Sequence, residues 1–138
     1  MLANSGAVTV SGGTLDIGSY SDTVGAVTVS SGSITGTTGV LTGSSYSITN
    51  SSGTATIGAI LGGSGTLAKS GAGTATLSKA NTYTGTTTVS AGTLNVTGTL
   101  SDSTAVTVNT GATYVVGAAD TVASIAGAGN ITLTGNLS

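Results

Sequence analysis

The 138-residue sequence has no cysteine, proline, tryptophan, phenylalanine or histidine, and charged residues make up only 4% of it. Without cysteine there can be no disulfide bond, and without both cysteine and histidine the usual ligands of zinc are missing. The two basic residues, Lys69 and Lys79, cannot form the cationic surface that nucleic-acid binding requires. No apolar run reaches the ~18 residues of a membrane-spanning helix. The sequence therefore predicts neither a nucleic-acid partner nor membrane insertion.

The abundant residues are glycine, with 24 copies, and the strand formers valine, isoleucine and threonine. Disordered chains are poor in β-branched residues and carry high net charge, so this composition favours ordered β-structure. Short segments such as 8–10, 27–29 and 106–108 alternate apolar and polar residues, which is typical of a strand with one buried face. No apolar pattern of helical period accompanies them. The secondary structure is therefore predicted to be all β.

Two landmarks recur along the whole chain with the same period. The first is a mostly apolar position, occupied in turn by Val8, Val27, Tyr46, Leu67, Thr87, Val106 and Ile125. The second is a glycine turn, found at Gly13, Gly32, Gly53, Gly73, Gly92, Gly111 and Gly129. Successive members of both series stand about 20 residues apart, within the range of solenoid repeats. Because the two series keep one period, each repeat is predicted to form one structural unit.

Strands this short are unstable as isolated hairpins, and parallel stacking of successive turns solves the problem. Each strand then pairs with its counterpart one coil away, where a coil is one full turn of the chain. The sequence predicts a single domain over residues 1–138, folded as a right-handed parallel β-helix of about seven coils with 19–20 residues each. Its core is predicted to be narrow and filled by Val, Leu, Ile, Ala and an occasional Tyr.

Catalytic chemistry has few possible participants, because histidine, cysteine, glutamate and arginine are all absent. Acid–base catalysis would fall to the four aspartates assisted by the lysines, namely Asp16, Asp22, Asp102, Asp120, Lys69 and Lys79. Asp16 falls in the first coil and Asp102 and Asp120 in later ones, so we predict turn and surface positions and no carboxylate pair. A calcium-binding repeat would need an aspartate where Leu67 stands. The sequence thus predicts no catalytic, cofactor-binding or metal site, and no enzyme.

The segment Gly63–Val96 contains several motifs that belong together. They are Gly65-Thr66-Leu67, Asn81-Thr82-Tyr83-Thr84-Gly85 and Ala91-Gly92-Thr93-Leu94, with Lys69 between the first two. On these motifs the segment resembles the autotransporter-associated β-strand repeat, also called the passenger-associated transport repeat, of bacterial autotransporter passenger domains. The resemblance implies a right-handed β-helix, export to the outer-membrane surface and a passive role in secretion or display. Outside residues 63–96 only the shared coil pattern supports it.

Threonine-rich columns are predicted on the outer surface of the solenoid. In the glycine-turn alignment, the outward residues form successive pairs: Thr14/Asp16, Ser33/Thr35, Thr54/Thr56, Thr74/Thr76, Thr93/Asn95, Thr113/Val115 and Asn130/Thr132. Regular threonine ranks of this kind are used by ice-binding proteins, so ice binding is one alternative function. The simpler interpretation is that threonine is the best polar strand former.

The two ends of the predicted solenoid lack the charge, proline or helix that usually protects an open strand edge. The repeat starts within residues 3–10 and continues to residues 131–137. Uncapped edges predict end-to-end self-association into a homopolymer, and hence an extracellular fibre or stalk at the bacterial cell surface. The alternative is a passive passenger segment of an autotransporter or adhesin, which supports secretion and display at the same location.

Overall fold

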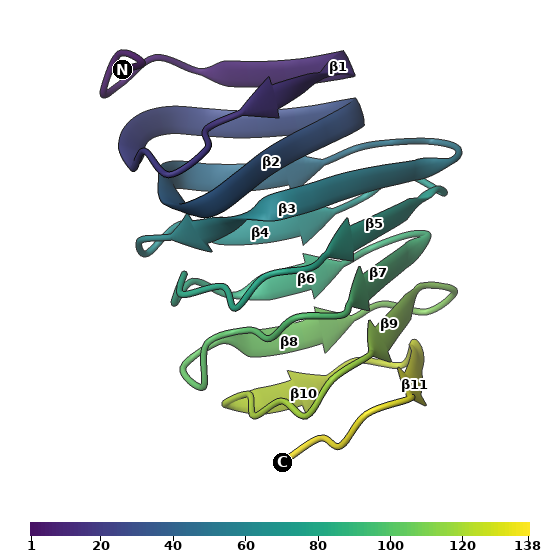
Figure 1. The fold of residues 1–138 in the computed structure, drawn as a ribbon. Coiled ribbons are helices and arrows are strands. Elements are labelled where there is room, and N and C mark those ends of the chain that lie inside the picture. The colour runs from purple at the N-terminus through teal and green to yellow at the C-terminus, as the bar shows by residue number, and fades with distance from the viewer.

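The computed structural model describes residues 1–138 as an 11-stranded β-structure without helices. The chain winds in stacked coils, and its two termini lie at opposite ends of the stack (Figure 1). The strands are β1 (Val8–Asp16), β2 (Asp22–Ile48), β3 (Thr54–Gly62), β4 (Thr66–Lys69), β5 (Thr74–Leu77), β6 (Thr87–Val89), β7 (Thr93–Val96), β8 (Ala105–Val108), β9 (Thr113–Val116), β10 (Ser124–Ala126) and β11 (Asn130–Leu133). The predicted all-β solenoid is confirmed.

Two long faces and one short face form each coil, and every strand pair is parallel. Face A contains the first part of β1, both ends of β2, and then β4, β6, β8 and β10. Face B contains the second part of β1, the middle of β2, and then β3, β5, β7, β9 and β11. Face C is short, pairs residues 40–42 with 60–62, and continues as isolated bridges. A strand segment that one coil contributes to a face is called a rung. From the first to the last rung of face A the chain makes about six full turns, close to the predicted seven.

The inward column of face A follows the predicted apolar series. Val8 pairs with Val27, Tyr46 with Leu67, Leu67 with Thr87, Thr87 with Val106, and Ile125 with Val106. The long strand β2 supplies two rungs because it wraps a whole coil, and the Thr49 amide donates to the Val29 carbonyl across those rungs at 2.9 Å. The spacing of the apolar series is therefore the coil length on this face.

The register of face B differs from the prediction at one place. The glycine-turn series aligned Ile34 with Ala55, whereas Ile34 pairs with Ile57. A register shift follows at once, between Thr35 and Val40, where β2 has more residues than β3. A displacement of two residues leaves every side chain on its own face, so the alternation of apolar and polar residues could not reveal it. From Ala55 onward the predicted alignment holds, with Ala75, Leu94, Tyr114 and Ile131 in one column.

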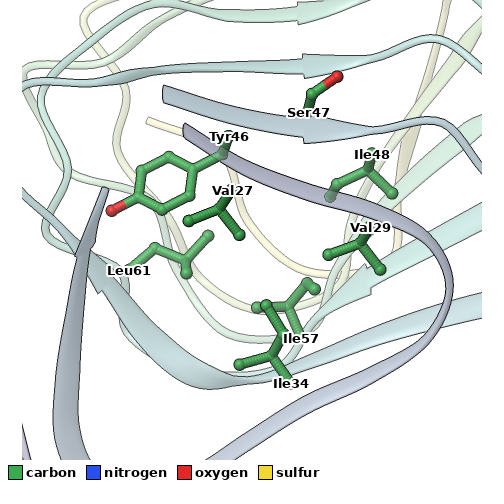
Figure 2. Close-up of a pocket in the computed structure, with 8 residues that line it drawn as sticks. All are labelled: Val27, Val29, Ile34, Tyr46, Ser47, Ile48, Ile57 and Leu61. Atoms are coloured by element: carbon green, nitrogen blue, oxygen red, sulfur yellow. The ribbon is translucent and has the colours of Figure 1, made fainter. Parts of the chain in front are cut away.

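The core is one continuous cluster of 26 buried apolar residues running along the axis. Valine, leucine, isoleucine and alanine make up most of it, with Tyr46, Tyr83 and Tyr114 as the large members, as the composition predicted. A small void of about 10 Å³ remains beside the paired residues Ile34 and Ile57, next to the register shift (Figure 2). Its walls are almost entirely apolar, so we expect it to be dry.

Filling this void is expected to stabilise the fold. Val29 lines it, and Val29→Ile adds one methyl group that should raise the free energy of unfolding by about 0.8 kcal/mol. Val108 is the matched control, because it is equally buried but does not line the void. Val108→Ile should instead cost about 1 kcal/mol through overpacking. Urea unfolding of both variants measures the two changes in the free energy of unfolding. Equal changes would contradict the presence of a void beside Val29.

Candidate functional site

The charged side chains occupy very different environments. Asp16 is exposed and accepts a hydrogen bond from the Gly18 amide at 2.9 Å, and Asp22 accepts from the amides of Thr23 and Leu2. Lys79 is partly exposed and donates to a backbone carbonyl at 3.4 Å. Asp16 holds the turn after β1, as the sequence predicted. The predicted surface position is wrong for Asp120, which is buried, and Lys69 is buried as well.

Asp102 and Asp120 lie closer together than the sequence predicted. Both line a polar hollow of about 250 Å³, together with Thr99, Leu100, Ala119, Thr121 and Ser138. Burial raises the pKa of Asp120, and the negative charge of Asp102 raises it further. The structure has no group of three or more His, Cys, Asp or Glu residues able to hold a metal ion.

The side chain of Asp120 completes backbone hydrogen bonding at a corner. Only 6% of the residue is exposed. Its carboxylate accepts from the Leu100 amide, at 3.2 Å for Oδ1 and 3.1 Å for Oδ2, and from the Thr121 amide at 3.0 Å. Because an amide buried without an acceptor is costly, this carboxylate stabilises the coil that precedes it.

Asn81 also completes backbone hydrogen bonding at a corner, two coils before Asp120. It is 4% exposed, and its Oδ1 accepts from the Leu61 amide at 3.0 Å. Its Nδ2 donates to the carbonyls of Lys79 at 2.9 Å and Thr99 at 3.3 Å. One side chain therefore ties together three successive coils. The first residue of the Asn-Thr-Tyr-Thr-Gly motif is a structural link.

Asp120→Asn is expected to stabilise the protein at neutral pH, because an amide can replace the carboxylate as acceptor without a buried charge. The folded-state pKa of Asp120 is raised, so its contribution is complete at acidic pH and is lost as the pH rises through that pKa. We expect a gain of about 1 kcal/mol at pH 7 that vanishes near pH 3. Thermal unfolding at the two values tests this, with exposed Asp16→Asn as control. A gain of equal size at both values would contradict it.

The other motif residues also serve the fold. Tyr83 is fully buried, its hydroxyl lies 2.7 Å from Thr87 Oγ1, and its ring lies 5.8 Å from that of Tyr46. A Cβ at Gly85 would collide with the backbone carbonyl of Gly65 in the preceding coil, so only glycine fits there. The motif thus fills the core and allows close stacking at a corner.

Lys69 is the most unusual residue of the interior. It is 0% exposed and stands in an inward column between Ile48 and Val89. Its ammonium donates to the Gly71 carbonyl, and desolvation lowers its pKa. Lys69 was considered above only as a helper in acid–base catalysis and as part of the repeat motif, and its burial was not predicted. The signal was available, because Lys69 follows Leu67 by two residues and therefore shares its inward direction.

The outward threonines form a less regular array than predicted. After the register shift, Thr14 and Ser33 align with Thr56 and not with Thr54. Each rung of face B has two outward positions. Both are threonine only in the rungs with residues 54/56 and 74/76. In the next two rungs the second outward position is Asn95 and then Val115. A two-column threonine lattice on this face is therefore short.

The apolar core, the stacked coils and the use of buried polar groups to join those coils define a structural β-solenoid. The family model of the passenger-associated transport repeat matches the chain at residues 3–17 and 67–96. The second match contains Lys69, Asn81, Tyr83 and Gly85, so the resemblance predicted for residues 63–96 is confirmed. The first match covers the whole of β1 and was not predicted. Neither the curated proteins nor the solved structures gave a match. No helix of the structure is long and apolar enough to cross a membrane.

Proposed function

We propose that this chain is a non-enzymatic structural segment of a bacterial surface protein, a rod that supports export and display in the manner of an autotransporter passenger. The main support for this proposal is that residues of the matched repeat make their contacts inside the fold. Asn81 links coils, and Tyr83 fills the core. Residues used in this way serve the architecture of the rod. The family suggests an extracellular or outer-membrane surface location.

The arrangement of the charged groups supports a non-enzymatic role. Lys69 is sealed inside the core, and Asp16 and Asp22 accept hydrogen bonds from backbone amides. The hollow between Asp102 and Asp120 offers two carboxylates but neither histidine, cysteine nor an amine. The hydrogen bonds that Asp120 accepts from the amides of Leu100 and Thr121 also commit this carboxylate to the backbone.

A display experiment tests the proposed role. Residues 1–138 are placed between a reporter epitope and the membrane anchor of an autotransporter, and surface epitope is measured by antibody binding to intact cells. The matched control is a Gly/Ser linker of equal length, which cannot fold into coils. We expect more surface epitope with the folded segment, and a loss of that advantage with Asn81→Ala. Equal display by the linker would overturn the proposal.

We also propose that such rods associate end to end into an extracellular fibre or stalk. The support is the open strand edge of β1 at one end of the stack and those of β10 and β11 at the other. An edge of this kind accepts the next coil, whether that coil belongs to the same chain or to a second copy. Fibres of stacked coils should show a reflection near ~4.8 Å along their axis, the spacing of hydrogen-bonded strands.

Ice binding is the less supported alternative. It would need threonine at both outward positions over many rungs, and face B provides this at only two consecutive rungs. We therefore expect no thermal hysteresis in a solution of the purified chain, and clear hysteresis would restore this alternative.

A further inference from the structure

We infer that Lys69 delays the folding of this segment, and that the delay keeps the chain unfolded until it has been exported. The inference rests on the proposed role in export. A folded coil is wider than an extended chain, so folding supports display only after the chain has crossed the outer membrane. Three observations support the inference: the environment of the ammonium, the local character of its hydrogen bond, and its position in the middle of the stack.

The ammonium of Lys69 is buried without a counter-charge. The residue is 0% exposed, and its partners in the neighbouring coils are the apolar residues Ile48 and Val89. Its one hydrogen bond goes to the Gly71 carbonyl. Desolvation lowers the pKa of Lys69, and no charged group offsets this effect. Folding must therefore remove the hydration shell of a cation in exchange for a single hydrogen bond.

The hydrogen bond of Lys69 does not join two coils. It closes within one coil, from residue 69 to residue 71. Asn81, in contrast, accepts from the Leu61 amide of the preceding coil and donates to the Thr99 carbonyl of the following coil. Lys69 thus carries a desolvation cost without contributing a link between coils. Residues that lower stability without serving the architecture are expected where function requires them.

The position of Lys69 in the stack makes this cost unavoidable. The lysine interrupts the inward column of face A that contains Val10, Val29, Ile48, Val89 and Val108. Coils of a solenoid contact only their neighbours, so folding starts locally and spreads from coil to coil. A complete rod cannot form without the coil of Lys69, whichever coils fold first. The desolvation cost consequently falls on every folding route.

The lysine acts on the folding step and not on the unfolded chain. In the unfolded chain the ammonium is hydrated and carries no cost. Folding transition states have already buried most of the surface that the native state buries, so the cost raises the folding barrier. The folded rod tolerates the lysine because the 26 buried apolar residues of the core outweigh it.

Refolding kinetics test the delay. Residues 1–138 are unfolded in urea and diluted, and the return of β-structure is followed by stopped-flow circular dichroism. Lys69→Met should refold about tenfold faster than the wild type. Lys79→Met removes the same charge from a partly exposed position and should refold at the wild-type rate. Lys69→Leu is the second variant if Lys69→Met does not fold. A Lys69 variant that refolds at the wild-type rate would overturn the inference.

The display experiment described above tests the consequence for export. Lys69→Met should show less surface epitope than the wild type, with the missing epitope accessible to antibody only after the outer membrane is permeabilised. Lys79→Met should match the wild type. Faster refolding of Lys69→Met with undiminished surface epitope would also overturn the inference. The proposed function fails on a different comparison, between the wild-type segment and the Gly/Ser linker, in which no lysine variant takes part.

Discussion

Replacing Asn81 with alanine is expected to lower the free energy of unfolding by about 1–3 kcal/mol. The substitution leaves the Leu61 amide without the Asn81 acceptor, in a region where the residue itself is only 4% exposed. The carbonyls of Lys79 and Thr99 lose one donor each but keep backbone hydrogen bonds from the amides of Thr99 and Asn81. Each buried polar group left unpaired costs about 1–3 kcal/mol. Urea unfolding followed by circular dichroism measures the loss.

Asn95 provides the matched control. It has the same chemistry but points outward from β7, where it is partly exposed and makes no side-chain hydrogen bond. Asn95→Ala should change the stability by no more than ~0.5 kcal/mol. Asn81→Asp separates the two halves of the link, because a carboxylate can still accept from the Leu61 amide but cannot donate to the two carbonyls. A stability close to that of the wild type in Asn81→Ala would show that the coils do not depend on this side chain.

Lys69→Met is expected to stabilise the protein by about 1–4 kcal/mol at neutral pH. Methionine has a similar length and fits a column occupied by Ile48 and Val89, whereas the ammonium must give up its hydration for one hydrogen bond to the Gly71 carbonyl. Lys79→Met removes the same charge from a partly exposed position and should change the stability by less than ~0.5 kcal/mol. Denaturant midpoints of both variants provide the comparison; a destabilised Lys69→Met would mean that the ammonium is needed.

The same residue should make stability depend on pH. Burial lowers the pKa of Lys69 from its ordinary value of 10.5, so the folded state binds fewer protons than the unfolded state between the two values. The free energy of unfolding therefore rises with pH up to about 10.5 and falls as the pH drops toward the folded pKa. Above this range the buried tyrosines act in the opposite direction, because desolvation raises the pKa of Tyr83 and Tyr114. Lys69→Met should abolish the rise and leave the alkaline fall unchanged.

The coil period and face A could be read directly from the sequence, because the inward positions from Val8 to Ile125 recur at a nearly constant spacing. Face B was less accessible, since pairing Ile34 with Ile57 instead of Ala55 preserves the inward and outward pattern. The buried charges were missed for another reason. Average preferences place aspartate at the surface, which fails for Asp120. The burial of Lys69 is explained by the column through Ile48, Lys69 and Val89.

The role of Asn81 could not have been inferred from spacing alone. Its hydrogen-bond partners, the Leu61 amide and the Thr99 carbonyl, lie 20 and 18 residues away along the chain. They meet it only because the corner of one coil stands between the corners of its neighbours. The motif identified the right residues, and the stacked geometry was required to explain why an asparagine is used.

The placement of the termini at opposite ends of the stack has a mechanical consequence. A pull on the two ends acts along the hydrogen bonds that join successive coils, so the bonds are loaded a few at a time as each coil peels away. Every released coil adds about 65 Å of contour length, from roughly 20 residues at about 3.3 Å each. A rod built in this way yields stepwise under tension and lengthens more than about tenfold before its chain is taut, since each coil occupies only about 4.8 Å of the stack.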